Sequence, residues 1–219
     1  MKNTKIDWCD ATINPVIGCK NGCTYCYARK INDRFHFIDK WDEPQFFKER
    51  LKQLDSKKPK SIFMDSMSDI GWWKPEWGIK VYNAMKKNPQ HNYIFLTKGN
   101  TVFCDYEKNI FNGASITSQN MADKIYWNVH FDFYSIEPLL EPIKLSLHKN
   151  NKNLKQIIIG AETGNRKGKV IPKKEWVKEI VDFADKNNIK IFMKESLRNI
   201  MGDDFRQDKL IWDVNKEKK

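Results

Sequence analysis

The 219-residue chain lacks the features that would direct it to a membrane or out of the cell. It has no apolar run near the roughly 20 residues that a membrane-spanning helix needs. Its first residues, MKNTKIDWCD, carry charges where a secretory signal peptide has its apolar segment. Its five cysteines are too few for a disulfide scaffold, and an odd number cannot all pair within one chain. We therefore expect a cytoplasmic protein with no membrane partner, whose cysteines are reduced or bind a metal.

The composition is typical of a globular protein with one hydrophobic core. Hydrophobic residues make up 40% of the chain and aromatic residues 13%. No internal repeat, low-complexity block or linker divides the sequence. A length of 219 residues is near the upper end of what one core usually serves. The sequence therefore predicts a single domain over residues 1–219.

The chain is basic, with 39 Lys and Arg residues against 28 Asp and Glu residues and a formal net charge of +11. A nucleic-acid partner would favour such a charge. Many of the lysines, however, stand beside asparagine and isoleucine, a bias that AT-rich coding sequence produces without selection for binding. Basic residues indicate a binding surface only when they cluster on one face, which a sequence does not show. Nucleic acid is one candidate partner, and compositional bias is the alternative.

Short β-type runs alternate with segments that have helical spacing. The predicted strands are 61–65, 92–97, 112–117, 131–136, 156–161 and 190–194, and the predicted helices lie within 74–88 and 172–188. This alternation is typical of a parallel sheet with helices on the outside. The predicted fold class is therefore α/β.

Polar residues stand at the carboxyl ends of these predicted strands, where ligands collect in parallel α/β folds. One such charge by itself is more often solvated or paired for structural reasons. Five strands with polar groups at the same end carry more weight, and they predict a binding site. Its candidate residues are Ser66, Met67, Ser68, Asp69, Lys98, Ser115, Thr117, Glu137, Glu162 and Lys194.

Three of the five cysteines fall within eight residues, in the stretch GCKNGCTYCYARK. Cys19, Cys23 and Cys26 are separated by three and two residues, and the glycines between and before them let the backbone curl. Thiolates on such a loop can converge on one inorganic centre. Cubane iron–sulfur clusters are held by thiolates on short loops, and three ligands would leave one iron open to another molecule.

Two alternatives explain the thiols less well. A structural zinc site needs a fourth ligand, and the nearest candidates, His36 and Cys9, give no paired arrangement typical of zinc. A catalytic nucleophile would not need three thiols. Cys9 and Cys104, which lie outside the loop, are expected to be free thiols buried for packing.

The spacing C-KNG-C-TY-C resembles the CxxxCxφC signature of the radical S-adenosylmethionine (SAM) superfamily, with Tyr25 at the aromatic position φ. The resemblance implies a [4Fe–4S] cluster on Cys19, Cys23 and Cys26 whose open iron chelates SAM. It also implies reductive cleavage of SAM to methionine and a 5′-deoxyadenosyl radical that abstracts hydrogen from a substrate. A reductase or flavodoxin-like electron donor is an implied partner. The resemblance does not identify the substrate.

A narrower resemblance covers nearly the whole chain. The stretch ATINPVIGCKNGCTYCYA and the later blocks FMDSMSDIGWW, PQHNYIFLTKGN, GASITSQN, FYSIEPLLEPI, IIIGAETGNRKGKVI and IFMKES are similar to the phage Gp37/Gp68-like (DUF5131) family. For the fold, the resemblance implies a partial (β/α) barrel of the radical SAM type, with parallel strands, outer helices and the cluster loop after the first strand.

With the resemblance, the strand-end residues become candidates for binding SAM. The segment Ser66, Met67, Ser68 and Asp69 would bind the amine of SAM, and Lys98 its carboxylate. Ser115 and Thr117 would bind the ribose, and Glu137 and Glu162 the cofactor or the substrate. Lys194 would be a charge partner if it is buried beside either glutamate. The alternative function is an iron–sulfur or zinc protein that binds nucleic acid without turning over SAM.

Overall fold

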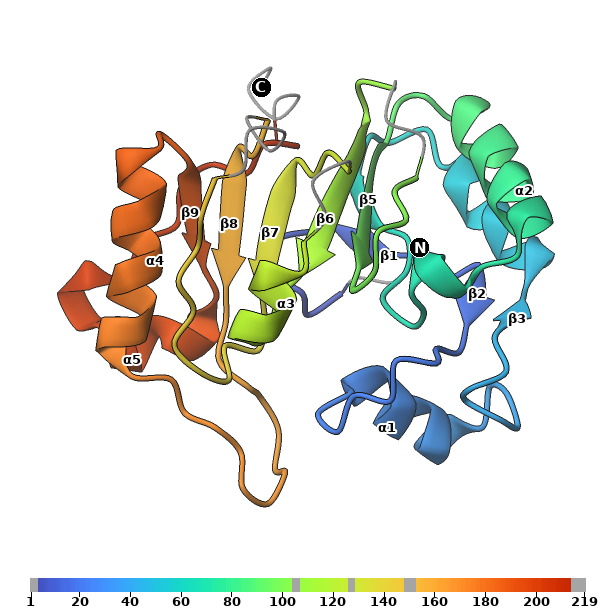
Figure 1. Ribbon diagram of the computed structural model, residues 1–219. Coiled ribbons are helices and arrows are strands. Elements are labelled where there is room, and N and C mark those ends of the chain that lie inside the picture. The colour runs from blue at the N-terminus through green and yellow to red at the C-terminus, as the bar shows by residue number, and fades with distance from the viewer. Residues whose placement is uncertain (1–3, 104–106, 126–128, 148–152, 214–219) are drawn as a thin grey trace. The chain divides into compact units, whose positions relative to one another are not determined.

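The computed structural model describes residues 4–103, 107–125, 129–147 and 153–213 (Figure 1). The chain forms two compact units. The first unit comprises Met1–Thr97 and Thr101–Asn112, and the second comprises Lys98–Asn100 and Gly113–Lys219. Cys104, for which we expected a free thiol, lies outside the described residues.

The first unit contains parallel strands in the order β1, β4, β5 and the first half of β6. Their bounds are Ala11–Thr12 for β1, Ser61–Phe63 for β4, Asn92–Thr97 for β5 and Ile110–Ser115 for β6. The antiparallel pair β2 (Val16–Ile17) and β3 (Gln45–Phe46) stands apart from this ladder. The helices are α1 (Tyr27–Phe35) and α2 (Pro75–Lys86), with 3-10 turns η1 (Lys48–Asp55) and η2 (Ile70–Trp72).

The second unit continues from the end of β6 through β7 (Phe133–Ile136), β8 (Gln156–Ile159) and β9 (Lys190–Met193), all parallel and in that order. Its helices are α3 (Gln119–Asp123), α4 (Lys174–Lys186) and α5 (Arg198–Met201), with 3-10 turns η3 (Glu195–Leu197) and η4 (Gly202–Asp204). Helix α4 lies against β9 (Figure 1). Within the described ranges, none of the helices has the length and apolar character to cross a lipid bilayer.

The α/β class predicted from the alternating pattern is confirmed. Strand β5 has the predicted bounds, whereas β6 begins two residues earlier than predicted, at Ile110. The two-residue strands β1, β2 and β3 were not predicted, because segments of that length carry no measurable periodicity.

The core of the first unit is formed by strand side chains and the apolar stripe of α2. Ile62 and Met64, which belong to β4 and its end, pack with Tyr93 and Phe95 of β5. The stripe of α2 covers them, and its Val81 is fully buried. Strands buried on both faces are expected in a parallel sheet that helices cover.

The core of the second unit has the same plan. All four residues of β8 are buried, and α4 adds the buried side chains of Val177, Ile180 and Ala184, which lie within the predicted helix 172–188. The ring of Phe133 in β7 meets that of Trp212 edge to face, with 4.9 Å between the ring centroids.

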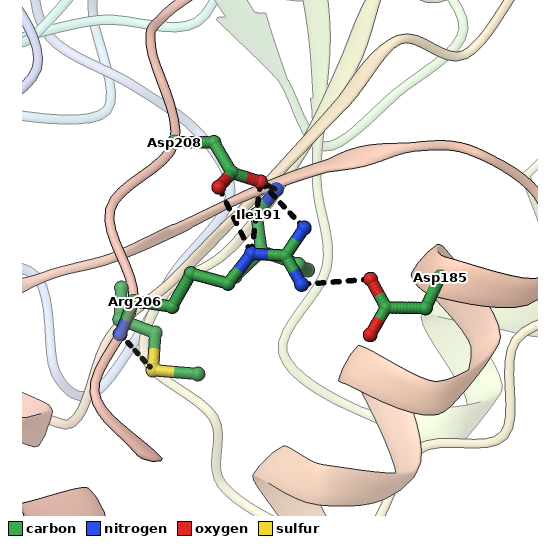
Figure 2. A network of polar contacts seen from close by, with 5 residues as sticks. Asp185, Ile191, Arg206 and Asp208 are labelled. Atoms are coloured by element: carbon green, nitrogen blue, oxygen red, sulfur yellow. Dashed lines mark hydrogen bonds and ion pairs between the residues drawn. The ribbon is translucent and has the colours of Figure 1, made fainter. Parts of the chain in front are cut away.

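A polar network holds the C-terminal segment to β9 and α4 (Figure 2). The Arg206 guanidinium donates to Asp185 of α4 at 2.7 Å and, through Nε and Nη2, to Asp208. The Asp208 carboxylate also accepts the backbone N–H of Ile191 in β9 at 2.8 Å. A planar guanidinium can make these contacts together because its donors form a rigid fork.

Candidate functional site

The three clustered cysteines lie on the loop between β2 and α1 in the first unit. Cys26 is the N-cap of α1, and its Sγ accepts the backbone N–H of Arg29 at 3.4 Å. The Sγ of Cys19 accepts the backbone N–H of Asn21 at 3.5 Å. Because N–H donors and a helix N-terminus favour negative charge, they suit sulfurs that bind as thiolates.

The three thiols are close enough to act on one another electrostatically. Burial is the largest of the causes that raise the pKa of Cys19 to about 12, and nearby Asp69, Cys23 and Cys26 also raise it, whereas the Asn21 N–H lowers it. Without a bound cation this thiol is protonated at neutral pH. Binding of a metal centre would release that proton, since metal-bound thiols are deprotonated.

The entrance to the loop is fixed by backbone contacts. The Gly18 N–H donates to the carbonyl of Met67 at 3.0 Å, and the Cys19 N–H donates to that of Trp41 at 2.8 Å. Gly18 has a φ of 109°, and a Cβ built on it would lie 2.8 Å from the Cα of Pro44. Only glycine fits this position, because any larger residue would be strained and would collide with backbone.

The residues that follow β4 are joined to the cysteine loop. Tyr27, next to Cys26, donates its hydroxyl to the carbonyl of Ser66 at 2.9 Å. The side-chain oxygen of Asn14 accepts the Ser66 hydroxyl at 3.0 Å and the Met67 N–H at 2.9 Å. The Met67 side chain is buried in a small core cluster against which Cys26 packs. Ser66 and Met67 are therefore neighbours of the thiol-bearing helix start.

Asp69 forms the tightest connection between the two segments. It is 5% exposed, and its carboxylate accepts the side-chain amide of Asn21 at 2.7 Å, the Thr97 hydroxyl at 2.7 Å and the Gly71 N–H at 2.9 Å. The Asn21 carbonyl oxygen in turn accepts the indole N–H of Trp72 at 2.7 Å. Asp69 and Asn21 thus fix the position of the residues between Cys19 and Cys23.

A second buried carboxylate, Asp65, lies near Asp69. It accepts the Leu96 N–H at 3.1 and 3.3 Å through its two oxygens. Burial, and then the charge of Asp69, raise the pKa of Asp65 well above its usual value. Two neighbouring carboxylates in a buried site favour the state in which one is neutral.

The predicted residues Lys98, Ser115 and Thr117 lie in the second unit. The Lys98 ammonium, just after β5, donates to the Ser115 hydroxyl at the end of β6 at 2.6 Å. Thr117 is buried, and its hydroxyl contacts the sulfur of Met121 at 3.3 Å. The structure therefore brings Lys98 and Ser115 together.

The two predicted glutamates, Glu137 and Glu162, are each paired with a cation. Lys194 forms an ion pair with Glu137, and the two side chains are 13% and 25% exposed. Glu162 is buried and accepts Nε and Nη2 of Arg166 at 2.5 and 2.7 Å. It also lines an open hollow of about 430 Å³ with Lys169. Of the two glutamates, the ion-pair partner of Lys194 is Glu137.

The three cysteine side chains are the type of ligand that binds an iron–sulfur cluster. Within the residues that the structure describes, no three His, Cys, Asp or Glu side chains are gathered closely enough to hold a single metal ion. A cubane cluster binds each thiolate on a different iron atom, so its sulfurs stand farther apart than the ligands of one ion. Three neighbouring thiols on one loop, two of which accept backbone N–H groups, are donors of the type that such a cluster takes.

Several residues of this site were not predicted from the sequence. They are Asn14, Asn21, Asp65, Trp72 and Thr97. All of them lie in or beside the quoted sequence blocks, but a single sequence does not show which polar residue of a block points toward the cysteines. Asn21 had the best signal, because it stands between two of the three cysteines.

Comparison with known proteins gives a family and a distant relative. The model of a family described as "Protein of unknown function (DUF5131)" matches residues 3–208. An uncharacterized protein of Methanocaldococcus jannaschii is 33% identical over 109 residues, which are 48% of this chain and 41% of that protein. The chain thus spans about two fifths of the length of this curated relative. No solved structure is significantly similar to the chain.

Proposed function

We propose a function for this chain from the fact that it belongs to the DUF5131 family, whose members are described as proteins of unknown function. The proposed function is that of a radical SAM enzyme with the partial (β/α) barrel of that superfamily. The observation that supports it most is the cysteine loop, whose three thiols interact and whose backbone is fixed to the segment after β4. The parallel α/β architecture is compatible with it.

Cys19, Cys23 and Cys26 would hold the [4Fe–4S] cluster in this proposal. When bound, such a cluster supplies the electron that cleaves SAM into methionine and a 5′-deoxyadenosyl radical, which abstracts hydrogen from a substrate. The chain itself supplies position. The N–H groups of Asn21 and Arg29 stabilise sulfur charge, and the Asn21–Asp69 hydrogen bond keeps the loop in place.

The segment after β4 is the proposed site for the amine of SAM. Ser66 is half-buried and lies within hydrogen-bond reach of Tyr27, the residue that follows Cys26. Ser68 and Met67 complete the segment. The carboxylate of Asp69 already accepts three donors from the protein, so we assign it to positioning of the loop.

The second unit would supply further SAM ligands. The Lys98 ammonium, which donates to the Ser115 hydroxyl, is the proposed partner of the SAM carboxylate. Ser115 and Thr117 are the proposed partners of the ribose hydroxyls of SAM. Glu137, Glu162 and Lys194 are proposed for cofactor or substrate. A Lys98→Ala variant that binds SAM as tightly as the wild type would remove that residue from the site.

The proposed reaction needs a one-electron donor. A reductase or a flavodoxin-like protein is the proposed partner, since the chain offers no second cysteine cluster from which an electron could come.

Anaerobic reconstitution with iron and sulfide, followed by dithionite and SAM, tests the proposal. We expect about four irons per chain and formation of 5′-deoxyadenosine. The Cys23→Ala variant should lose both, because it removes a proposed ligand. Cys9→Ala is the matched control: it removes a half-buried thiol of the same unit that lies outside the loop, and it should retain both signals.

Two outcomes would contradict the proposal. Tight binding of zinc in place of iron would assign the loop to a structural metal. A cluster that forms but never yields 5′-deoxyadenosine would favour the alternative function, an iron–sulfur protein that binds nucleic acid without SAM turnover.

A further inference from the structure

The positive charge of the chain is concentrated on one part of the first unit. Residues 48–60 and 74–87, called here the η1–α2 face, contain ten Lys and Arg residues and three Asp and Glu residues, a formal charge of +7 out of +11. The other 192 residues contain 29 basic and 25 acidic residues, or +4. A lysine bias of the coding sequence would spread charge evenly, so it does not account for this concentration.

We propose that the η1–α2 face binds the phosphate backbone of nucleic acid. The two segments are packed side by side, as Figure 1 shows for α2 and the turns before β4. Leu54 of η1 and Val81 of α2 belong to the same core cluster. Just after the second segment, the Gln90 side chain donates to the carbonyl of Ser56 in the first segment at 2.8 Å. Because the two segments pack together over one core, their exposed lysines lie on adjacent parts of the surface.

Most of the lysines of this face are exposed to solvent. Eight of them are exposed: Lys48, Lys52, Lys57, Lys58, Lys74, Lys80, Lys86 and Lys87. Within the described part of the chain, none of the eight forms a salt bridge. Lys174 and Lys178 in the second unit differ, since both bind Asp204.

Aromatic rings hold three of the ammonium groups in place. The distances from Nζ to the ring centroid are 5.2 Å for Lys74 over Trp77, 5.7 Å for Lys80 over Phe46 and 6.0 Å for Lys86 over Tyr82. The Phe46 and Trp77 rings are stacked, with 6.0 Å between centroids. A cation over a ring face keeps its full charge, so the rings order these lysines without neutralising them.

An anionic membrane fits this face less well than nucleic acid does. A helix that binds in the membrane interface inserts an apolar face between the lipids. In α2 the apolar stripe is buried in the core through Val81 and Met85, and Ile79 is its exposed large apolar residue. Ammonium groups spread over two packed segments instead suit a polyanion with regularly spaced charges.

Fluorescence anisotropy with labelled single-stranded and duplex DNA, measured from about 50 to 200 mM salt, tests the proposal. The test variant is Lys80→Glu, Lys86→Glu and Lys87→Glu combined. The matched control is Lys144→Glu, Lys173→Glu and Lys186→Glu, which changes net charge equally with exposed lysines of the second unit. Circular dichroism checks that each variant folds.

The wild type should bind with an affinity that falls steeply as salt rises, because bound phosphates release their counterions. The test variant should bind at least about tenfold more weakly at low salt. Its slope of log affinity against log salt concentration should be shallower by about 0.9 for each phosphate that the variant no longer neutralises. The control variant should stay within about threefold of the wild type.

Three results would overturn the proposal. They are no binding of DNA at low salt, an equal loss in both triple variants, which would reflect net charge alone, and binding to phosphatidylserine vesicles in place of DNA. The experiment needs neither the cluster nor SAM. Its failure would therefore leave the proposed enzymatic function untouched, and the reverse also holds.

Discussion

At the scale of single residues, two neighbouring buried carboxylates of the first unit have different roles. Asp69 accepts three hydrogen bonds from the protein and connects the loop to β5 through Thr97. Asp65 accepts a backbone N–H and has a raised pKa. Hydrogen bonds to a buried carboxylate hold structure, and a pKa that folding shifts in either direction makes stability depend on pH.

Replacement of Asp69 should destabilise the protein strongly. In Asp69→Ala the donors on Asn21, Gly71 and Thr97 lose their acceptor in a buried site, which costs about 2–4 kcal/mol of unfolding free energy. Urea unfolding measures the change. Asp203→Ala, at an exposed position, should change it by less than about 0.5 kcal/mol. Similar unfolding free energies for the two variants would show that Asp69 does not support the loop.

At the scale of elements, the cysteine loop is set by its two ends. Gly18 enters it through a left-handed φ and a backbone contact that leaves no room for a Cβ, and Cys26 leaves it as the N-cap of α1. Fixed ends limit where the thiols between them can lie. The loop is therefore a part of the first unit's packing and not a free surface excursion.

The two glycines of the loop should differ in their tolerance of alanine. Gly18→Ala meets Pro44 Cα at 2.8 Å and the Trp41 carbonyl at 2.9 Å, and we expect it to cost more than about 2 kcal/mol of stability. Gly22→Ala has a φ of 65° but nothing within 4 Å of the new Cβ, so about 1 kcal/mol is expected. Thermal and urea unfolding of both variants compares them. An equal cost would mean that the contact at Gly18 relaxes freely.

At the scale of the whole molecule, buried and half-buried ionisable groups set how stability varies with pH. The pKa of Asp208 is lowered: burial acts to raise it, but the hydrogen bonds from Arg206 and Ile191 outweigh burial. Its contribution is present above the usual carboxyl pKa and is lost as pH falls through the lowered value. Asp65 acts in the opposite direction, because its raised pKa gives stability that is complete at low pH and lost as pH rises.

The pH dependence of unfolding should therefore change in Asp65→Asn. The wild type should lose stability from the ordinary carboxyl value of 3.8 up to the raised pKa of Asp65, because over this range the carboxyl ionises in the unfolded chain while it stays neutral in the folded protein. The amide cannot ionise, so the variant should lose less stability than the wild type between about pH 5 and pH 8. Urea unfolding at both pH values measures this, with Asp203→Asn as the control. An unchanged pH dependence would mean that Asp65 ionises without penalty.

The secondary structure was predictable where the elements are long enough to show a pattern. Strand β5 and helices α2 and α4 follow from alternation and helical spacing, since a buried stripe imposes its period on the sequence. Strands β1 to β3 escaped prediction because two residues contain no period. Strand β6 covers Ile110–Ser115 and not the predicted 112–117, because the strand begins at the buried residue Ile110.

The site was predictable by residue type and not by contact. The proximity of the Cys19, Cys23 and Cys26 thiols follows from their spacing, because all three stand within eight residues on one loop. The roles of Asn21 and Asp69 in fixing that loop do not follow, since their hydrogen bond joins residues 48 positions apart. Likewise the pairing of Lys194 with Glu137 depends on which strands become neighbours.

The sequence by itself determined the α/β class and the three-thiol loop, since hydrophobic period and local spacing are properties of adjacent residues. It also determined the net charge of +11, which is a count. Only the tertiary structure decided that Asp69 is buried against Asn21 and that the lysine-rich residues 48–60 pack beside residues 74–87. The physical reason is that burial and charge density depend on which distant segments pack together, and packing is decided by the whole core.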